Sequence, residues 1–397
     1  MEQVLYQLPD GWAWKRLSEL AKTTSGGTPS RSNKDYWGGT IPWVKSGELG
    51  DSRVERNEEF ITELGLKNSS AKLFPKESLL IALYGATAGK LGILAYPAAT
   101  NQAVCCISPD DKLLERDFLR YYLLSQRKKI IEDSFGGAQP NISQAYVRDI
   151  KIPTPPIVEQ KRLTEKLDAL LNRIDTAIEN LQESITLADT LLKSSLNSML
   201  TPRENWEWVR MNDVCQITSK LCDPREEQYL DMFHIGGANI TQFSGSLINV
   251  KTAREEQLIS GKFPFDTSMV LYSKIRPYLM KVARPMISGI CSADIYPLTP
   301  VREKMTRDFL FYLLLSEQFT QYAIEGSSRA GMPKVNRNHL FSFAFHLPSL
   351  DEQVSICESL DALVEKTNEA SIELEGKLVY LTSLKASILD SAFKGEF

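Results

Sequence analysis

The chain has 397 residues, of which 43% are hydrophobic and 24% are charged; at about 150 residues per domain, this length predicts two or three domains. The composition is typical of folded globular proteins and excludes wholesale disorder and collagen-like repeats. The net charge of −4 excludes a uniformly basic protein, and the 6 cysteines, without a C-x-x-C pair, predict neither a disulfide scaffold nor a metal site.

The first residues, Met1 to Trp14, lack the basic flank and long apolar run of a signal peptide or membrane anchor. We therefore expect a cytoplasmic protein without a membrane segment. Residues 1–157 are predicted to form a first mixed α/β lobe, because short apolar runs alternate there with glycine- and proline-bearing segments. The predicted strands and helix of this lobe are, in chain order, Ser78–Tyr84, Leu91–Tyr96, Ala103–Ile107 and Glu115–Ile131.

Residues 85–90, Gly-Ala-Thr-Ala-Gly-Lys, lie between two of these strands and predict a hairpin loop whose glycines permit positive φ. The segment does not match a nucleotide-binding phosphate loop, because it is one spacer residue short and has no hydroxyl after Lys90. Thr87 and Lys90 at its tip can still meet phosphates.

Two stretches, residues 158–200 and 351–397, are predicted to form long spacer helices. No glycine or proline lies between Pro156 and Pro202, and apolar residues recur there at steps of three and four. The second stretch repeats this spacing, and Gly376 is expected to weaken or kink it. About forty residues give a helix of roughly 60 Å, too long for a small domain to cover. We therefore expect the two helices to pack antiparallel, as a coiled coil.

The second half of the chain repeats the first. Residues 201–350 are predicted to form a second mixed α/β lobe, with strands at Met269–Tyr272 and Met280–Ala283 and a helix at Arg307–Tyr322. The duplication, with antiparallel helices, predicts a pseudo-twofold relation between the halves. The matching segments are Trp12–Trp14 with Trp206–Trp208, Asp117–Leu119 with Asp308–Leu310, Glu159–Gln160 with Glu352–Gln353, and Leu167–Leu170 with Leu360–Leu363.

The charges are unevenly distributed. Residues 1–157 carry 20 basic and 18 acidic residues and residues 201–350 carry 17 and 15, whereas residues 351–397 carry 4 and 10. The lobes can thus approach a polyanion while the helices face solvent or a partner protein. Motifs of hydrolases, metalloproteases, dinucleotide-binding enzymes and amino-methyltransferases are missing. We therefore expect neither catalytic residues nor a cofactor.

Several loops combine basic, amide and aromatic side chains. Arginine and lysine can address guanine, and asparagine and glutamine can address adenine, although the same residue types are common in solvated turns. The candidate DNA-binding residues are Thr28, Arg31, Lys34, Thr87, Lys90, Gln139, Asn141, Lys220, Lys274, Arg276, Tyr278, Arg329, Lys334, Asn336 and Arg337.

The order of motifs along the chain resembles the specificity subunit of type I restriction-modification systems. Each lobe is followed by a helix with Glu-Gln near its start and Leu-Asp-Ala-Leu further in, and the resemblance covers essentially the whole chain. Each motif is weak alone, but the duplicated order is specific. The other matching segments are Leu8–Trp12, Trp14–Leu17, Ser25–Pro29, Ile41–Trp43, Gln139–Asn141, Ile152–Pro156 and Ala392–Glu396.

The resemblance implies a non-enzymatic reader of double-stranded DNA. Each lobe would be a target recognition domain and each helix a conserved spacer. Because the inner sequences of the lobes differ, the target would be asymmetric and bipartite. The helices would dock two methyltransferase subunits, and motor-nuclease subunits would join that core. The helix residues expected to serve partner binding are Leu163, Leu167, Leu170, Ile174, Leu360, Leu363, Leu374 and Leu381.

Two alternatives stay open. One is a specificity subunit of a type IIB-like restriction-methylation enzyme. The other is a coiled-coil adaptor that binds only proteins, which salt-dependent retention on DNA would distinguish from a DNA reader.

Overall fold

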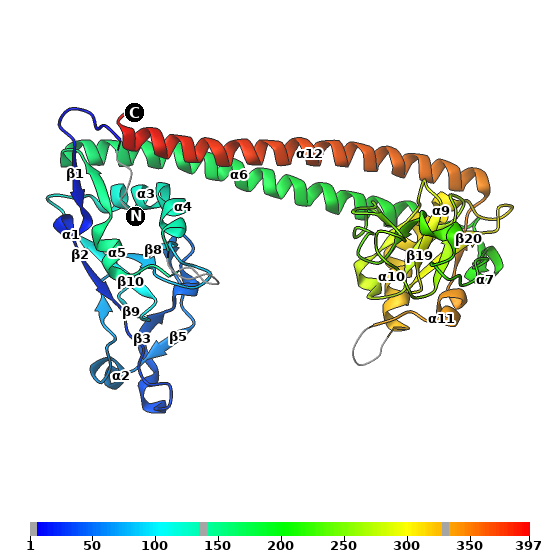
Figure 1. The fold of residues 1–397 in the computed structure, drawn as a ribbon, viewed down its shortest axis with the longest axis horizontal. Helices are drawn as coiled ribbons and strands as arrows, with labels where there is room; N and C mark the ends of the chain where they lie inside the picture. Colours follow the sequence, from blue (N-terminus) through cyan, green and yellow to red (C-terminus); the bar gives the residue numbers. More distant parts are fainter. Residues whose placement is uncertain (1–5, 135–140, 328–332) are drawn as a thin grey trace. The chain divides into compact units, whose positions relative to one another are not determined.

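A computed structural model of the chain describes residues 6–134, 141–327 and 333–397. The chain forms two compact units (Figure 1): unit 1 contains residues 1–181 and 376–397, and unit 2 contains residues 182–375. Each unit combines one lobe with the adjoining parts of two long helices, α6 (Ile157–Met199) and α12 (Leu350–Lys394). The two predicted long helices are thus confirmed, and α12 continues through Gly376.

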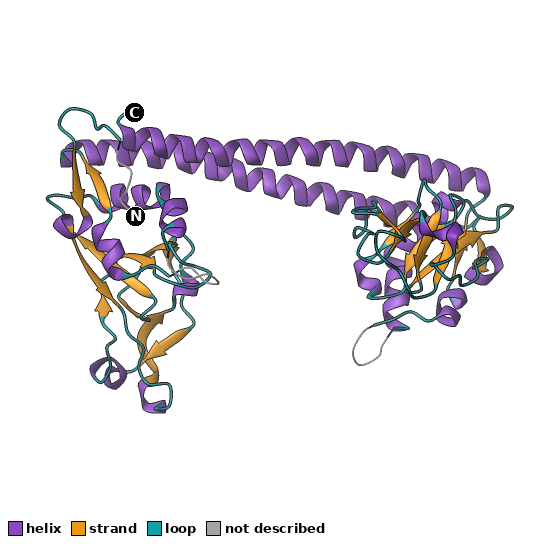
Figure 2. Cartoon of the chain, in the orientation of Figure 1, coloured by secondary structure: helices purple, strands orange, loops and turns teal. Residues whose placement is uncertain are grey.

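The lobe of unit 1 is built on two main sheets and a two-stranded ribbon, with short helices around them (Figure 2). The first sheet has the order β2-β10-β7-β8-β4, the second has the order β5-β3-β9-β6, and β1 pairs with β11. The strands are β1 (Ala13–Arg16), β2 (Ala21–Ser25), β3 (Trp37–Val44), β4 (Arg53–Val54), β5 (Glu59–Ile61), β6 (Leu73–Phe74), β7 (Leu79–Ala82), β8 (Leu91–Leu94), β9 (Ala98–Thr100), β10 (Val104–Pro109) and β11 (Lys151–Thr154).

The three predicted strands of this lobe are confirmed as β7, β8 and β10. The predicted helix over Glu115–Ile131 is present but divided at Gln126 into α3 and α4, because Gln126 has φ −88° and ψ −1° instead of regular helical angles. The helices of the lobe are α1 (Leu17–Leu20), η1 (Lys34–Tyr36), η2 (Ser46–Glu48), α2 (Glu63–Lys67), α3 (Arg116–Ser125), α4 (Arg127–Glu132) and α5 (Gln144–Asp149).

The lobe of unit 2 repeats this architecture. Its sheets have the orders β13-β20-β17-β18 and β15-β14-β19-β16, and β12 pairs with β21. The strands are β12 (Glu207–Arg210), β13 (Cys215–Gln216), β14 (Phe233–Ile235), β15 (Lys251–Thr252), β16 (Lys262–Phe265), β17 (Val270–Ser273), β18 (Val282–Ala283), β19 (Gly289–Ser292), β20 (Ile295–Pro300) and β21 (Ala344–Leu347). The helices are α7 (Met211–Val214), α8 (Glu227–Leu230), η3 (Pro277–Leu279), α9 (Arg307–Leu315), α10 (Glu317–Glu325) and α11 (Arg337–Ser342).

The predicted strands of this lobe are confirmed as β17 and β18. The predicted helix at Arg307–Tyr322 is again divided, here at Ser316, whose extended backbone ends α9 while its hydroxyl accepts from Phe319 N and caps α10. Each lobe has a parallel strand pair at the equivalent place in its second sheet: β3 with β9 in unit 1 and β14 with β19 in unit 2. The duplication inferred from the sequence is therefore a duplication of topology.

The two long helices run antiparallel within each unit. In unit 1, Arg162 at the start of α6 donates to the carbonyl of Phe397, and Asp175 further along α6 pairs with Lys385 of α12. In unit 2, Arg203 just after α6 pairs with Glu352 at the start of α12. The antiparallel packing expected from the sequence is confirmed in both units.

The apolar side chains of the long helices also pack into the hydrophobic cores of the lobes. In unit 1, Leu163 and Leu167 are buried in one core with Phe118 of α3 and Phe393 of α12, whose ring contacts Phe118 at a centroid distance of 5.2 Å. In unit 2, Leu360 is buried among residues of α9 and β21. Burial of these side chains stabilises the attachment of each lobe to its helices.

Candidate nucleic-acid interface

Three backbone segments meet in each lobe, and we call this place the junction. In unit 1, Leu83 N donates to Ala103 O (2.7 Å), Ile142 N donates to Leu83 O (2.6 Å), and Tyr84 forms a β-bridge with Asn141. The junction of unit 1 comprises residues 83–85, 101–103 and 141–143. It joins the ends of β7 and β9 to the segment before α5.

The junction of unit 2 repeats these contacts bond for bond. Lys274 N donates to Asp294 O (3.0 Å), Val335 N donates to Lys274 O (2.9 Å), and Ile275 forms a β-bridge with Lys334. It comprises residues 274–276, 292–294 and 333–336. The backbone is shared, whereas the side chains differ: Leu83 corresponds to Lys274, Ala103 to Asp294 and Asn141 to Lys334. One scaffold thus presents two different sets of functional groups.

Several predicted residues of unit 1 lie at or beside its junction. Asn141 is exposed, and the hydroxyl of Thr28 donates to the side-chain oxygen of Gln102. Gln144 at the start of α5 bonds to Ser25 (3.0 Å), which links the β2 end to the same place. Gln139 lies outside the described residues. The structure therefore places Asn141 in the junction and Thr28 against the junction residue Gln102.

The predicted hairpin loop is confirmed between β7 and β8, which pair antiparallel. Gly85 has φ +86° and Gly89 has φ +76°, in the left-handed region that favours glycine. The loop is tightened by a hydrogen bond from Lys90 N to Thr87 O of 2.9 Å, and both side chains are half-buried. Thr87 and Lys90 thus flank the turn that follows the junction residue Tyr84.

Arg31 and Lys34 belong to a different part of unit 1, next to the second sheet. The guanidinium of Arg31 lies 3.7 Å from the ring centroid of Trp37 and forms an ion pair with Glu59. Glu59 also pairs with Lys45 at 3.2 Å, and these cations lower the pKa of Glu59, Arg31 most strongly. Lys34 is exposed in η1. The guanidinium of Arg31 therefore already contacts Trp37 and Glu59 within the protein.

Lys274 and Lys334 contact the same carboxylate at the junction of unit 2. Lys334 Nζ lies 3.2 Å from Asp294 Oδ1, and Lys274 Nζ lies 3.5 Å from the same atom. The Lys274 side chain is only 12% exposed, and its ammonium donates to Ala293 O. Burial, reinforced by the nearby charge of Lys334, lowers the pKa of Lys274.

Arg276 and Tyr278 follow Lys274 on the same loop. Arg276 is exposed and has φ +51°, and its N donates to Pro333 O (2.9 Å). Pro277 occupies the first position of η3, where its fixed φ helps to hold the preceding turn. Tyr278 is 52% exposed. Both side chains are thus presented to solvent, Arg276 within the junction and Tyr278 beside it.

The remaining candidates of unit 2 differ in their surroundings. Asn336 is the N-cap of α11, where its side chain accepts from His339 N at 2.8 Å, so a structural contact already occupies that oxygen. Arg337 is exposed, with its guanidinium 5.6 Å from the ring centroid of Phe341. Lys220 is exposed in the loop after β13, and Arg329 lies outside the described residues.

The sequence prediction missed Asp294, Gln102 and Tyr84 as junction residues. A carboxylate does not suggest a DNA contact by composition, and Tyr84 lies within a run that predicts a buried strand. A signal was available in the repeat: Gln102 and Asp294 both follow an equivalent strand, β9 or β19, and precede the next one. Aligning the two lobes strand by strand would have identified these positions.

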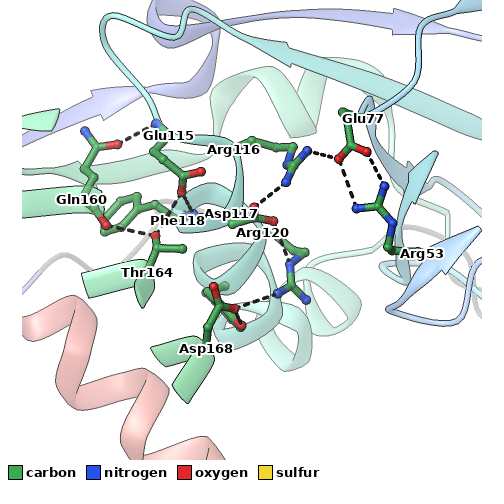
Figure 3. Close-up of polar contacts among 11 residues, drawn as sticks. Arg53, Glu77, Glu115, Arg116, Asp117, Phe118, Arg120, Gln160, Thr164 and Asp168 are labelled. Carbon is green, nitrogen blue, oxygen red and sulfur yellow. Dashed lines mark hydrogen bonds and ion pairs between the residues drawn. The ribbon is translucent and has the colours of Figure 1, made fainter. Parts of the chain in front are cut away.

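The repeated Glu-Gln motif fastens each lobe to its helix. Figure 3 shows Gln160 of α6 beside Glu115, the N-cap residue of α3. The Gln160 amide accepts from Glu115 N (2.8 Å) and donates to Leu113 O (3.0 Å) and Pro155 O (2.9 Å). Gln353 makes the corresponding three contacts in unit 2. Both glutamines are fully buried.

The aspartate of the Leu-Asp-Ala-Leu motif makes a second attachment. In unit 1, Asp168 of α6 accepts from the Tyr121 hydroxyl, and Arg120 lies 3.8 Å away (Figure 3). In unit 2, Asp361 accepts from the Tyr312 hydroxyl and pairs with Arg284. The tyrosines are equivalent, whereas the arginines come from different places in the chain. The motifs therefore hold α3 and α9 against the long helices.

A network of ions extends from α3 of unit 1 to the first sheet (Figure 3). Arg116 pairs with Asp117 and Glu77, each at 2.5 Å, and Glu77 also pairs with Arg53. The hydrogen bonds from Arg53 and Arg116, Arg53 first, lower the pKa of Glu77 to about 2. The network links α3 to β4 within the lobe that carries the junction.

Much of the helix stripe expected to bind partners is buried within the chain itself. Leu163, Leu167 and Leu360 are at most 1% exposed and Ile174 is 8% exposed, because they pack into the cores of the lobes. A partner therefore cannot reach these four side chains, which corrects the expectation for them. The other expected residues, Leu170, Leu363, Leu374 and Leu381, are half-buried. The exposed apolar side chains of the helices include Leu187, Leu191, Ile372, Val379 and Tyr380.

The described residues contain neither a candidate metal site nor a candidate membrane span. They contain no group of three or more His, Cys, Asp or Glu side chains placed to hold a metal ion. No described helix combines the length and apolarity needed to cross a membrane. All six cysteines are free thiols.

The chain was compared with known proteins. The family described as the type I restriction modification DNA specificity domain matches residues 9–187 and 203–375. The EcoDI specificity subunit of Escherichia coli is 30% identical over 318 residues, covering 72% of this chain and 70% of the relative. The StySPI specificity subunit of Salmonella potsdam is 22% identical over 422 residues, covering 98% and 90%.

Two solved structures share the fold. A chain from a study of complex assembly and conformational transition of the type I R-M system is 20% identical, with a TM-score of 0.78 and coverage of 99% of this chain and 100% of that chain. The HsdS subunit of Thermoanaerobacter tengcongensis is also 20% identical, with a TM-score of 0.56 and 99% coverage of both chains. With a family match in each half and the duplicated topology, the chain belongs to the type I restriction-modification DNA specificity family.

Proposed function

We propose that this chain is the DNA-recognition subunit of a type I restriction-modification complex and reads an asymmetric, bipartite target in double-stranded DNA. One observation carries the proposal: both lobes have the same junction backbone but present different polar side chains on it. Unit 1 offers Asn141 and Gln102, and unit 2 offers Lys334 and Asp294. Different groups on one scaffold support one half-site per lobe and a different sequence in each half-site.

The chain does no chemistry of its own in this proposal. Two methyltransferase subunits dock on the long helices, and motor-nuclease subunits join through that core. The exposed apolar side chains on the helices support this role, because Leu187 and Leu191 lie one turn apart on α6 and are therefore neighbours on one face of the helix, as a protein contact requires. The acidic charge of residues 351–397 makes α12 unsuited to DNA.

The test is reconstitution with purified components. The chain alone is expected to neither methylate nor cleave DNA, whereas adding its methyltransferase subunit in two copies per chain is expected to give methylation at one bipartite sequence. Affinity for that DNA should fall as salt rises, because phosphate contacts release counterions. Methyl transfer by the chain without partner would contradict the non-catalytic role. No retention on DNA would favour the protein-only adaptor.

A further inference from the structure

Asp294 is held at the surface of unit 2 by its own backbone. Its carbonyl accepts from Lys274 N (3.0 Å), and its N donates to the Ser292 hydroxyl (3.3 Å). The Asp294 side chain is 55% exposed, and that of Lys334 is 45% exposed, with 3.2 Å between the carboxylate and the ammonium. A negative acceptor and a positive donor therefore lie side by side at a fixed place on the junction.

The second lysine of this group faces inward. The side chain of Lys274 is nearly covered, and its ammonium is shared between Ala293 O and the Asp294 carboxylate. Lys274 thus contacts the Asp294 carboxylate from the protein side, and Lys334 is the exposed partner of that carboxylate. The equivalent positions of unit 1, Leu83, Ala103 and Asn141, carry no charge, so this arrangement belongs to unit 2 alone.

A carboxylate on a DNA-binding surface is repelled by phosphates, because the DNA backbone is densely negative. Its favourable contacts are with amino groups on base edges, and in the major groove aspartate accepts from the N4 amino group of cytosine. Lysine donates most commonly to O6 and N7 of guanine. An adjacent aspartate and lysine therefore match the two bases of a single G·C pair.

We propose that Asp294 and Lys334 read one G·C base pair in the half-site of unit 2, with Lys334 donating to guanine and Asp294 accepting from cytosine. Lys274 acts as the positioning residue of Asp294. This inference rests on the proposed function, since it assigns a base contact within the DNA-reading role. It also places this G·C pair in the half-site that unit 2 contacts, and not in the half-site of unit 1.

The test compares variants of the full chain assembled with its methyltransferase subunit. Each complex is incubated with a library of double-stranded DNA in which the target positions are randomised, and the bound DNA is sequenced. Asp294→Asn and Lys334→Gln are expected to relax the same single G·C position by roughly five- to 150-fold in discrimination. The other positions of both half-sites should stay unchanged.

Asp231→Asn is the matched control. Asp231 is also an exposed carboxylate of unit 2 in an ion pair, 2.9 Å from Arg254. It precedes β14, whereas Asp294 follows β19, and because these strands are parallel the two aspartates lie at opposite ends of the same sheet. The control should select the wild-type sequence. Thermal unfolding of each variant separates a lost base contact from a folding defect.

The outcomes distinguish this inference from the proposed function. If the wild-type complex selects no bipartite sequence, the proposed function fails and this inference fails with it. If the wild type selects a target, three results each overturn the inference alone: the second half-site lacks a G·C pair, Asp294→Asn weakens all sequences equally, or its motif is unchanged. Should Asp294→Asn misfold, Lys334→Gln decides, and an unchanged G·C preference in that variant overturns the inference.

Discussion

Replacing Gln160 by leucine is expected to loosen the lobe of unit 1 from its helix. Leucine has a similar volume but can neither accept from Glu115 N nor donate to Leu113 O and Pro155 O. Leu113 is 40% exposed and Glu115 is half-buried, whereas Pro155 is buried. The buried carbonyl of Pro155 and the backbone N–H of the half-buried Glu115 thus lose their partner.

An unsatisfied buried group costs about 1–3 kcal/mol, so the lost partner of Pro155 O alone should lower the free energy of unfolding of unit 1 by about 1–3 kcal/mol in Gln160→Leu. Hydrogen exchange followed along the chain measures this separately for each unit, which a single melting curve of a two-unit protein does not. Loss of protection should concentrate in unit 1. Gln353→Leu should produce the same effect in unit 2, since Gln353 makes the corresponding contacts.

Gln182→Leu is the control for this experiment. Gln182 is exposed on the same helix α6, and surface substitutions usually change stability by less than about 0.5 kcal/mol. A loss below about 1 kcal/mol for Gln160→Leu, or an equal loss for Gln182→Leu, would refute the role of the buried glutamine as the attachment between lobe and helix.

Three further outcomes are expected. Exchanging residues 203–350 for the lobe of a relative should change only one half-site of the methylated sequence, and a change in both would contradict independent reading. Inserting four residues after Leu181 and after Glu375, at the unit boundaries, adds about one turn and about 6 Å to each helix, so the unread gap between the half-sites should grow by one or two base pairs. Two-residue insertions rotate the apolar stripe by about 200° and should damage assembly. An unchanged gap with full activity after the four-residue insertions would show that the helices do not set the gap length. The pKa of Glu77 is lowered from 4.5 to about 2, so its ion pairs add stability above pH ~4.5 that is lost as the pH falls toward 2; Glu77→Gln should flatten this part of the acid unfolding curve, and an unaltered curve would show that the ion pairs contribute nothing.

The sequence alone was sufficient for the features that depend on periodicity and on repetition. The absence of glycine and proline between Pro156 and Pro202, with apolar residues at steps of three and four, specifies α6 without reference to any other part of the chain. The hairpin glycines Gly85 and Gly89 were also predictable, because a turn with positive φ selects glycine. These are local properties of the chain.

The partner of each helix side chain was not predictable from its spacing. One stripe on α6 serves both the packing against α12 and the core of the lobe, so periodicity identified Leu163 and Leu167 as apolar-face residues without showing what covers them. Burial is decided by the elements that pack on the helix. The same reason explains why the Glu-Gln motif was recognisable in sequence while the three hydrogen bonds of Gln160 were not.

The candidate DNA surface shows most clearly what could not be predicted from the sequence. Composition identified Lys274 and Lys334 as equivalent basic candidates, because residue type and loop position are the same for both. Only the tertiary structure brings the segment after β17, the end of β19 and the segment before α11 together at one junction, which covers Lys274 and leaves Lys334 exposed beside Asp294. The sequence determined which groups the chain carries, and the pairing of distant strands decided which of them face outward together, because strand pairing depends on contacts between residues far apart in the chain.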